Sequence, residues 1–270
     1  MAHPAIGQDQ QVIIGIGGIP ALVRSDSPDF LRMLERRYSG FISAQRRGGF
    51  EIDVELVPPA KITDEEEVTV RFAHGKWKIE RGDLRAEWEP DRRRGRIVQS
   101  ANPYSIDTAL RIIHSLILAS EGGLLVHAAS AVRNGRAFIF AGVSGAGKTT
   151  ISRLATLDAK LLTDEISYVR RGATGYLAYG TPFAGELAEP GENIEAPLGG
   201  LYFLEKGPEN ILEPLSGPEA VRMLLANVLF FANDPELVSM IFESACQLVR
   251  DVPVYRLTFF PDQRVWELIG

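Results

Sequence analysis

A short glycine-rich segment near the middle of the chain constrains the fold more than any other feature. Residues 142–149 read Gly-Val-Ser-Gly-Ala-Gly-Lys-Thr and satisfy the pattern G-x-x-x-x-G-K-[ST]. Glycines let successive backbone N–H groups converge on phosphate oxygens, the lysine adds a positive charge, and the threonine hydroxyl suits Mg²⁺. The pattern therefore predicts a phosphate-binding loop (P-loop) between a strand and a helix. The candidate nucleotide-binding residues are Gly142, Ser144, Gly145, Ala146, Gly147, Lys148, Thr149 and Thr150.

The sequence before the P-loop predicts a β-hairpin. Residues 124–132 and 136–141 are strand-like, and Asn134-Gly135 between them favours a two-residue type I′ turn, so the strands should be antiparallel. The register of such a hairpin places His127 opposite Gly142, roughly 4.5–5.5 Å away. An imidazole there can reach the phosphate site or hydrogen-bond an acid in it. A purely structural histidine is the alternative.

An acid pair follows the P-loop. Residues 149–157 are compatible with a helix, and residues 159–163 form a short apolar run that ends at Asp164 and Glu165. A strand–loop–helix–strand unit makes its two strands parallel, so the acids should lie at the carboxyl end of a strand beside the P-loop. Ligands bind at that edge of an α/β sheet. The predicted metal ligands are Thr149, Asp164 and Glu165.

These features resemble a known family. Residues 124–259 are similar to the catalytic domain of HPr kinase/phosphorylase, and the P-loop sequence also resembles that of ATP-dependent phosphoenolpyruvate carboxykinases. The resemblance rests on the hairpin that leads into the loop, a histidine upstream of it (His127), and the acid pair after the helix. It implies a mixed-sheet, P-loop-containing α/β domain of the HPr kinase/phosphoenolpyruvate carboxykinase type that uses ATP and Mg²⁺.

The resemblance also implies roles for individual residues. Asp164 falls on the catalytic acid/base that takes the proton from a substrate hydroxyl, and His127 falls on the histidine that modulates it. Lys148 is the third catalytic candidate, and Glu165 occupies the second position of an Asp-Asp pair. The segment responsible for the reverse, phosphorolytic reaction is not recognisable in residues 176–200.

Three further residues are weaker candidates. Residues 179–198 are rich in glycine, proline and acids, as in a loop that closes over a site, and Glu186 or Asn193 there could contact metal or substrate. A polar surface loop would have the same composition. Arg222 is a candidate phosphate contact, with a solvated helix-surface arginine as the alternative.

The part of the chain before the P-loop domain carries no recognisable chemistry. Residues 11–24 predict a hairpin, and Ser27-Pro28 predicts the start of a helix with Phe30, Leu34 and Tyr38 on one face. Residues 50–101 contain short alternating runs between turns, which predict an antiparallel meander. We therefore expect a smaller α+β domain over residues 1–103, with a possible role in substrate or partner recognition.

The second predicted domain covers residues 104–270 and begins with a helix. Ser105 is a candidate N-cap, and Ile106, Leu110, Ile113 and Ile117 recur at helical spacing before Gly122-Gly123. Towards the end of the chain, helices are predicted from Pro218 to Phe231 and from Pro235 to Val249, followed by a strand over residues 254–259.

Composition limits the environment and the partners of the chain. The 270 residues are 45% hydrophobic and 24% charged, with a net charge of −6, so nucleic acid is not an expected partner. Apolar runs are too short for a membrane helix, so no membrane partner is expected either. The single cysteine and an N-terminal segment without a secretory pattern predict a cytoplasmic protein. HPr kinases assemble as hexamers, so a homo-oligomer is a further possibility.

Together these features predict an ATP- and Mg²⁺-dependent kinase that phosphorylates a hydroxyl, expected to be a serine of a protein or peptide. Two alternatives remain open. The first is a kinase that acts on a small-molecule hydroxyl. The second is a non-catalytic, nucleotide-gated regulatory or peptide-delivery module.

Overall fold

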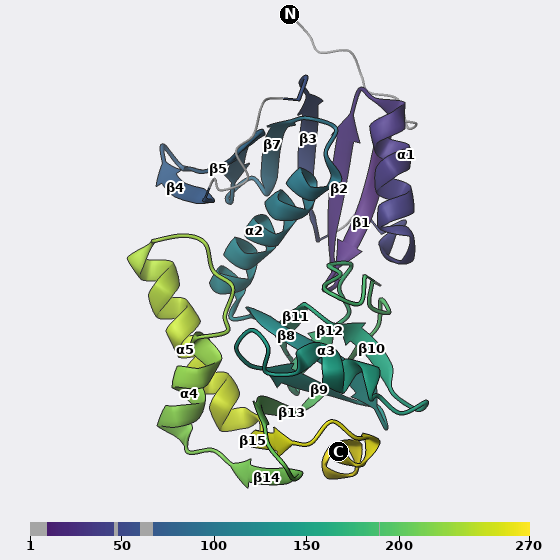
Figure 1. The fold of residues 1–270 in the computed structure, drawn as a ribbon. Coiled ribbons are helices and arrows are strands. Elements are labelled where there is room, and N and C mark those ends of the chain that lie inside the picture. Colours follow the sequence, from purple (N-terminus) through teal and green to yellow (C-terminus); the bar gives the residue numbers. More distant parts are fainter. Residues whose placement is uncertain (1–9, 46–47, 60–66, 189) are drawn as a thin grey trace, which may run out of the picture. The chain divides into compact units, whose positions relative to one another are not determined.

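The computed structural model describes residues 10–45, 48–59, 67–188 and 190–270, and its chain is mixed α/β with two mixed sheets (Figure 1). It forms two compact units. The first comprises residues up to His114 together with Phe231–Asp234, and the second comprises Ser115–Phe230 and Pro235–Gly270. The chain passes from the first unit to the second within the long helix α2 (Pro103–Glu121), so the sequence boundary at residue 103 falls at the start of that helix.

The first unit is built on a seven-stranded sheet of order β1-β2-β3-β7-β6-β5-β4. The predicted N-terminal hairpin is confirmed: β1 and β2 are antiparallel, and Gly17 and Gly18 turn with φ of 60° and 73°. The strands are β1 (Gln11–Ile16), β2 (Ile19–Ser25), β3 (Phe50–Leu56), β4 (Thr69–Ala73), β5 (Lys76–Arg81), β6 (Leu84–Glu89) and β7 (Arg94–Gln99).

The predicted helix after this hairpin is also confirmed. Helix α1 (Pro28–Arg37) begins after Ser27, whose hydroxyl accepts a hydrogen bond from the Phe30 N–H at 3.3 Å, and a short 3₁₀ helix, η2 (Ser39–Phe41), follows it. Phe30, Leu34 and Tyr38 are buried. Burial of this apolar face holds α1 against β1 and β2.

The predicted antiparallel meander is wrong for its first strand. Strands β4 to β7 do form an antiparallel meander, but β3 runs parallel to both β2 and β7. Alternating apolar residues fit a strand of either direction. The direction of β3 follows instead from the helix α1 between β2 and β3, because a helical crossover returns the chain parallel to the strand it left.

The predicted cap of helix α2 is wrong as well. The helix begins at Pro103, so Ser105 lies in its first turn, where its hydroxyl donates to Asp83 at 2.8 Å. The predicted apolar face is confirmed, since Ile106, Leu110, Ile113 and Ile117 are all buried. The helix ends at Glu121, before Gly122 with φ of 75°.

Asp83 is a buried carboxylate that joins two elements of the first unit. Its oxygens accept hydrogen bonds from the Ser105 hydroxyl and from both the backbone N–H and the hydroxyl of Ser100. Burial by itself raises the pKa of Asp83, but these donors outweigh it and leave the pKa below its ordinary value of 3.8. The charged form is therefore the one that stabilises the folded unit.

We expect Asp83→Asn to lower the stability of the first unit by about 1–3 kcal/mol at neutral pH, because buried donors lose part of their acceptor. The pKa is lowered on folding, so the contribution of the carboxylate is fully present above pH 3.8 and is lost as the pH falls through the folded pKa. Urea unfolding of both proteins at pH 7 and pH 3 checks this. A difference in unfolding free energy between the two proteins that is as large at pH 3 as at pH 7 would contradict this expectation.

The second unit is built on an eight-stranded mixed sheet. The predicted type I′ hairpin is confirmed: β8 and β9 are antiparallel, and Asn134 and Gly135 have φ of 52° and 73°. The strands are β8 (Leu124–Arg133), β9 (Arg136–Ala141), β10 (Lys160–Thr163), β11 (Ile166–Gly172), β12 (Gly175–Tyr179), β13 (Glu195–Lys206), β14 (Ile211–Pro214) and β15 (Val254–Phe259).

Strand β10 has the predicted direction but a different neighbour. It pairs antiparallel with β8, which in turn pairs antiparallel with β9, so β9 and β10 run the same way with β8 between them. On its other side, β9 pairs in parallel with β13, and β13 with β15. The acid pair therefore lies beside β8, one strand away from the strand that leads into the P-loop.

Helices cover both faces of this sheet. One apolar cluster includes Ile151 of α3 (Lys148–Arg153) and Trp266 of the C-terminal 3₁₀ helix η3 (Gln263–Leu268). The other includes residues of α4 (Gly217–Leu225) and α5 (Pro235–Asp251). The predicted helix from Pro218 to Phe231 is too long, because the chain leaves α4 at Leu225 and forms a bridge between Val228 and Val126 of β8.

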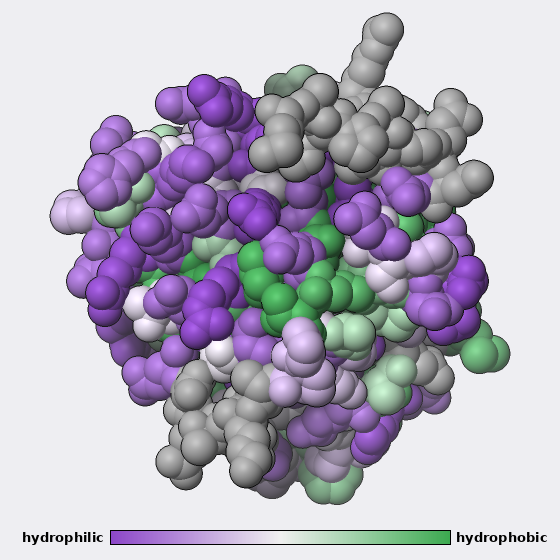
Figure 2. All heavy atoms as spheres, turned by 90° about the horizontal axis from the view of Figure 1, so that it is seen from above, coloured by the Kyte–Doolittle hydropathy of each residue, from purple (hydrophilic) through white to green (hydrophobic). Residues whose placement is uncertain are grey.

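Within the described residues, no helix is both long and apolar enough to cross a membrane. Hydrophilic residues cover most of the face seen in Figure 2, and hydrophobic residues gather in a smaller area near its centre.

Candidate phosphate-binding site

The P-loop folds as a tight turn between β9 and α3. Gly145 and Gly147 have φ of 78° and 116°, a region that favours glycine, and the Ala146 N–H donates to the Val143 carbonyl at 3.0 Å. A Cβ at residue 147 would lie 2.6 Å from the ring of Phe259 at the end of β15. Gly147 is thus required both by its backbone conformation and by the packing of β15 against the loop.

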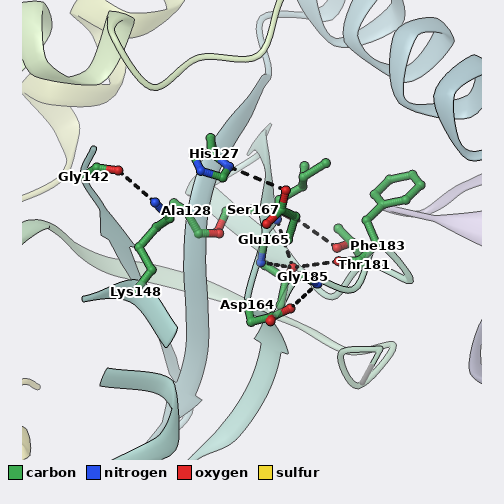
Figure 3. Close-up of polar contacts among 12 residues, drawn as sticks. His127, Ala128, Gly142, Lys148, Asp164, Glu165, Ser167, Thr181, Phe183 and Gly185 are labelled. Atoms are coloured by element: carbon green, nitrogen blue, oxygen red, sulfur yellow. Dashed lines mark hydrogen bonds and ion pairs between the residues drawn. The ribbon is translucent and has the colours of Figure 1, made fainter. Parts of the chain in front are cut away.

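Lys148 spans the P-loop that precedes it. Its ammonium group donates to the Gly142 carbonyl at 2.9 Å (Figure 3). Burial lowers the pKa of Lys148, while the negative charges of Glu165 and Glu186 oppose that shift. The ammonium group of Lys148 is therefore held in the loop, and the carboxylates of Glu165 and Glu186 are near enough to act on it.

Thr149 contacts Glu186 rather than either member of the acid pair. Its hydroxyl donates to Oε2 of Glu186 at 2.9 Å. Glu186 lies on the segment from Phe183 to Ala188, which we call the cover loop. The structure thus brings Glu186, one of the weaker sequence candidates, to the metal-ligand candidate of the P-loop, whereas the predicted metal ligands beside Thr149 were Asp164 and Glu165.

Asp164 is buried and holds the cover loop. Its Oδ1 accepts the Gly185 N–H and its Oδ2 accepts the Leu187 N–H, both at 2.8 Å. Only 3% of the residue is exposed. In Figure 3 its carboxylate is directed at Gly185. Each oxygen of Asp164 therefore accepts one backbone N–H of the cover loop.

The acid pair interrupts an otherwise continuous line of strand. Strands β10 and β11 lie end to end along β8, where Thr163 faces Ser130 and Ile166 faces His127. Between them the Glu165 carbonyl accepts the Ala128 N–H at 3.1 Å. The bend at Asp164 and Glu165 is thus flanked on both sides by pairing with β8.

His127 and Glu165 lie next to each other. Nδ1 of His127 is 3.9 Å from Oε1 of Glu165, and Figure 3 shows the two side chains directed at one another. Both side chains are about one-third exposed, at 35% and 31%. The His127 N–H donates to the Asn227 carbonyl at 2.7 Å, which fixes the backbone of this residue.

The predicted pairing of His127 with Gly142 is not part of the hairpin ladder. The β8–β9 ladder ends at Ala128 and Ala141, one step earlier, and His127 pairs with Ile166 of β11 on the other side. The acid beside the imidazole is Glu165, but the 3.9 Å between Nδ1 and Oε1 is longer than a hydrogen bond, so the predicted hydrogen bond between His127 and an acid stays a prediction.

Gly185 lets the cover loop approach the acid pair. A Cβ at this position would lie 2.8 Å from Oε2 of Glu165 and 3.0 Å from Oδ2 of Asp164. Sequence reasoning did not single out Gly185. The only local signal was its position directly before Glu186 in an acid-rich loop. Its hydrogen-bond partner, Asp164, lies 21 residues earlier in the sequence.

The remaining candidates take no part in these contacts. Ser144 and Gly145 lie exposed at the tip of the P-loop, and Thr150 lies half-buried within α3. Asn193 is exposed before β13, and Arg222 is exposed on α4. The structure supplies no contact that joins Asn193 or Arg222 to Lys148, Thr149 or the acid pair.

The donor set suits a nucleotide with Mg²⁺ better than a metal held by protein alone. Among the described residues, no group of three or more histidine, cysteine or acid side chains could hold a metal ion. Mg²⁺ is usually bound through one or two carboxylates together with phosphates and water. A threonine hydroxyl and one carboxylate beside a glycine cradle match that requirement.

Comparison with known proteins relates more than half of the chain to one family. The model of a family described as "SynChlorMet cassette protein ScmC" matches residues 99–270, which include every residue of the candidate site. A comparison with curated proteins finds none that matches.

Proposed function

The chain belongs to the ScmC family, and from its P-loop and the residues around it we propose that it is a kinase of the HPr kinase-related type. It would transfer the γ-phosphoryl group of ATP to a hydroxyl with the help of Mg²⁺. The observation that carries the proposal is the P-loop between β9 and α3, with Lys148 and Thr149 facing carboxylates of two other segments. Phosphoryl transfer needs little beyond such positioning and charge stabilisation.

The P-loop supplies the binding half of this mechanism. Its glycines present backbone N–H groups to phosphate oxygens, and Lys148 exchanges its bond to the Gly142 carbonyl for one to a β- or γ-phosphate oxygen. Mg²⁺, when bound, would supply positive charge to the phosphates. Thr149 and a nearby carboxylate would hold it on the protein side.

Glu165 and His127 are the residues that we assign to activation of the acceptor hydroxyl. A general base must reach the proton that it removes. Asp164, the acid implied by the family resemblance, is buried with each oxygen bound to a backbone N–H. Glu165 is partly exposed and lies beside His127. We therefore assign deprotonation of the acceptor hydroxyl to Glu165, orientation of Glu165 to His127, and placement of the cover loop to Asp164.

The proposed acceptor is a serine of a protein or peptide, as the family resemblance implies. The test is incubation of the full chain with Mg²⁺ and γ-labelled ATP in a lysate of its source, followed by fractionation by size. Label in a protein or peptide supports the proposal. Label in small metabolites would point to a small-molecule kinase, and bound ATP without any transfer would point to a nucleotide-gated module.

We expect Lys148→Met to weaken ATP binding by at least about tenfold, because the variant loses a charge-assisted contact with the phosphates. Calorimetric titration with ATP and Mg²⁺ measures this. Lys160→Met is the matched control, since Lys160 is an exposed lysine of the same unit whose ion pair is with Glu192. Equal affinity in the Lys148 and Lys160 variants would rule out the P-loop as the phosphate site.

A further inference from the structure

Charged side chains alternate in sign across the polar face of the seven-stranded sheet of the first unit. One row of residues that lie opposite each other on successive strands consists of Arg24 (β2), Asp53 (β3), Arg96 (β7), Glu87 (β6), Lys78 (β5) and Arg71 (β4). From β2 to β5 each charge lies opposite an unlike charge. At β4 the alternation fails, because Arg71 lies directly opposite Lys78.

This pair of like charges is unfavourable as the sheet stands. Like charges opposite each other on neighbouring strands destabilise a sheet. At the other end of the row, Arg24 has acid partners, with Nη1 2.8 Å from Glu51 and 3.3 Å from Asp53. Arg71 and Lys78 are both exposed, and neither has an ion pair with any residue that the structure describes. An acid on the outer side of Arg71 would relieve the repulsion and continue the alternation.

The backbone on that outer side is open to a further strand. Strand β4 is the last strand of the sheet (Figure 1), and no strand of the described residues pairs with its outer edge. An unpaired edge offers backbone N–H and C=O groups to another chain. An extended peptide added there would gain main-chain hydrogen bonds, and its side chains would alternate between the two faces of the sheet.

The apolar face of β4 carries an exposed ring at the same edge. Phe72 is 52% exposed, whereas Trp77 opposite it on β5 and Trp88 opposite Trp77 on β6 are 6% and 1% exposed. The ring centres of Phe72 and Trp77 are 5.0 Å apart. The row of buried aromatic residues thus ends at the open edge in a ring that the described residues leave half uncovered.

The register of β4 defines the side chains that a partner strand should carry. A residue opposite Arg71 faces the charged side of the sheet and should be an acid. Residues opposite Val70 and Phe72 face the apolar side and should be apolar, because Val70 and Phe72 lie opposite Ile79 and Trp77 on that side. The edge therefore suits an apolar–acid–apolar sequence in an extended conformation.

Arg71 also bears on which partner can occupy the edge. Antiparallel pairing of two β4 strands about this residue would place two arginines opposite each other, which disfavours a second copy of this chain. A charge on an edge strand can serve only to prevent pairing. An edge protected in that way does not need an exposed phenylalanine beside the charge, and Phe72 is one.

We propose that the outer edge of β4 binds an extended segment of a partner protein, which joins the sheet as a further strand and places an acid opposite Arg71 between two apolar residues. The inference does not rest on the kinase proposal, because every residue that it uses belongs to the first unit.

The test uses two synthetic peptides with blocked ends, Ser-Thr-Val-Glu-Val-Thr-Ser and the same sequence with lysine in place of glutamate. Fluorescence anisotropy of the labelled peptides measures their affinity for the full chain without nucleotide. We expect the parent to bind the glutamate peptide at least about fivefold more tightly than the lysine peptide. Arg71→Glu should reverse this preference, and it should stay folded because the new carboxylate lies opposite Lys78.

Two further variants and a second readout locate the site. Arg36→Glu makes the same charge change at an exposed position of α1 and should leave both affinities unchanged. Phe72→Ala should weaken both peptides, because both carry the apolar residues. Amide exchange in β4 should slow when the glutamate peptide is bound, since added main-chain hydrogen bonds protect the edge.

Three results would overturn the inference: equal affinity of the parent for the two peptides, no binding of either up to about 1 mM, or slower exchange elsewhere in the chain but not in β4. Dimerisation of the parent that Phe72→Ala abolishes would assign the edge to a second copy of the chain and overturn it as well. None of these measurements involves ATP, so each outcome leaves the kinase proposal to its own test.

Discussion

Replacing Glu165 with glutamine should lower the rate of phosphoryl transfer by about 10²–10⁴-fold while ATP still binds. Glutamine keeps the size of the side chain but cannot accept the proton of the acceptor hydroxyl, and general-base catalysis contributes about that factor. The P-loop does not depend on Glu165 for its conformation, because its turns are set by Gly145, Gly147 and their backbone bonds. Initial rates and ATP affinity, measured on the same preparation, give the two readouts.

Asp164→Asn is the matched comparison, because it changes the neighbouring acid in the same way. An amide at this position retains one acceptor oxygen but faces the second backbone N–H with an NH₂ group, so the cover loop should loosen. We expect faster hydrogen exchange at Gly185 and Leu187 and a higher KM in this variant. If Asp164→Asn instead abolished transfer with an undisturbed cover loop, and Glu165→Gln were active, the base would be Asp164.

His127 offers a further check on the same assignment. Nδ1 of its imidazole lies 3.9 Å from Oε1 of Glu165, so we expect His127 to act on the reaction through Glu165. As a positioning residue it should affect kcat more than KM, and His127→Gln should alter the acidic limb of the pH–rate profile. A uniform loss of folded protein without a change in the profile would indicate a structural role alone.

Local features of this chain could be predicted from sequence, because the residues that determine them are adjacent. Ser27-Pro28 specifies the start of α1, and Asn134-Gly135 specifies a turn in which both residues have positive φ. The P-loop pattern likewise specifies its own conformation through Gly145 and Gly147. In each case, the constraint and the structure that it produces lie within a few residues of each other.

Features that depend on distant partners could not be predicted in this way. The parallel direction of β3 depends on its neighbours β2 and β7, and the place of Ser105 inside α2 depends on Asp83, 22 residues earlier. The same holds for the site. Asp164 is the expected acid at the expected strand end, but its role is set by backbone donors of a loop more than 20 residues later.

The cover loop also shows why composition was a weak guide to the site. An acid-rich loop with glycine and proline is compatible with a lid or with an ordinary surface loop. What distinguishes them is the contact of Glu186 with Thr149 and of Gly185 with the acid pair. Thr149 and Glu186 are 37 residues apart in the sequence. Their contact therefore depends on how the strands of the sheet bring the two segments together, and neither segment predicts it alone.

Trp266→Ala should destabilise the second unit by about 3–5 kcal/mol, the usual cost of truncating a buried tryptophan. Trp266 is 1% exposed and packs edge to face with Phe140 of β9 at 5.5 Å between ring centres. Its indole N–H donates to the carbonyl of Ile151 in α3 at 3.1 Å. The C-terminal 3₁₀ helix thereby supports the helix that follows the P-loop, a role that sequence reasoning did not foresee.

The loss should extend from stability to nucleotide binding. Without the indole, the Ile151 carbonyl loses a donor, and α3 loses packing beside Lys148 and Thr149 at its first turn. Trp266→Phe is the control, since it restores much of the packing without the N–H and should recover most of the stability. Amide exchange of β9 and β13, two neighbouring strands of the second unit, reports on the stability of that unit directly. Unchanged ATP affinity in a Trp266→Ala protein whose amide exchange is faster would contradict this expectation. It would show that α3 holds its position without the C-terminal 3₁₀ helix, and that β9, β15 and the glycines of the P-loop are sufficient to organise the loop.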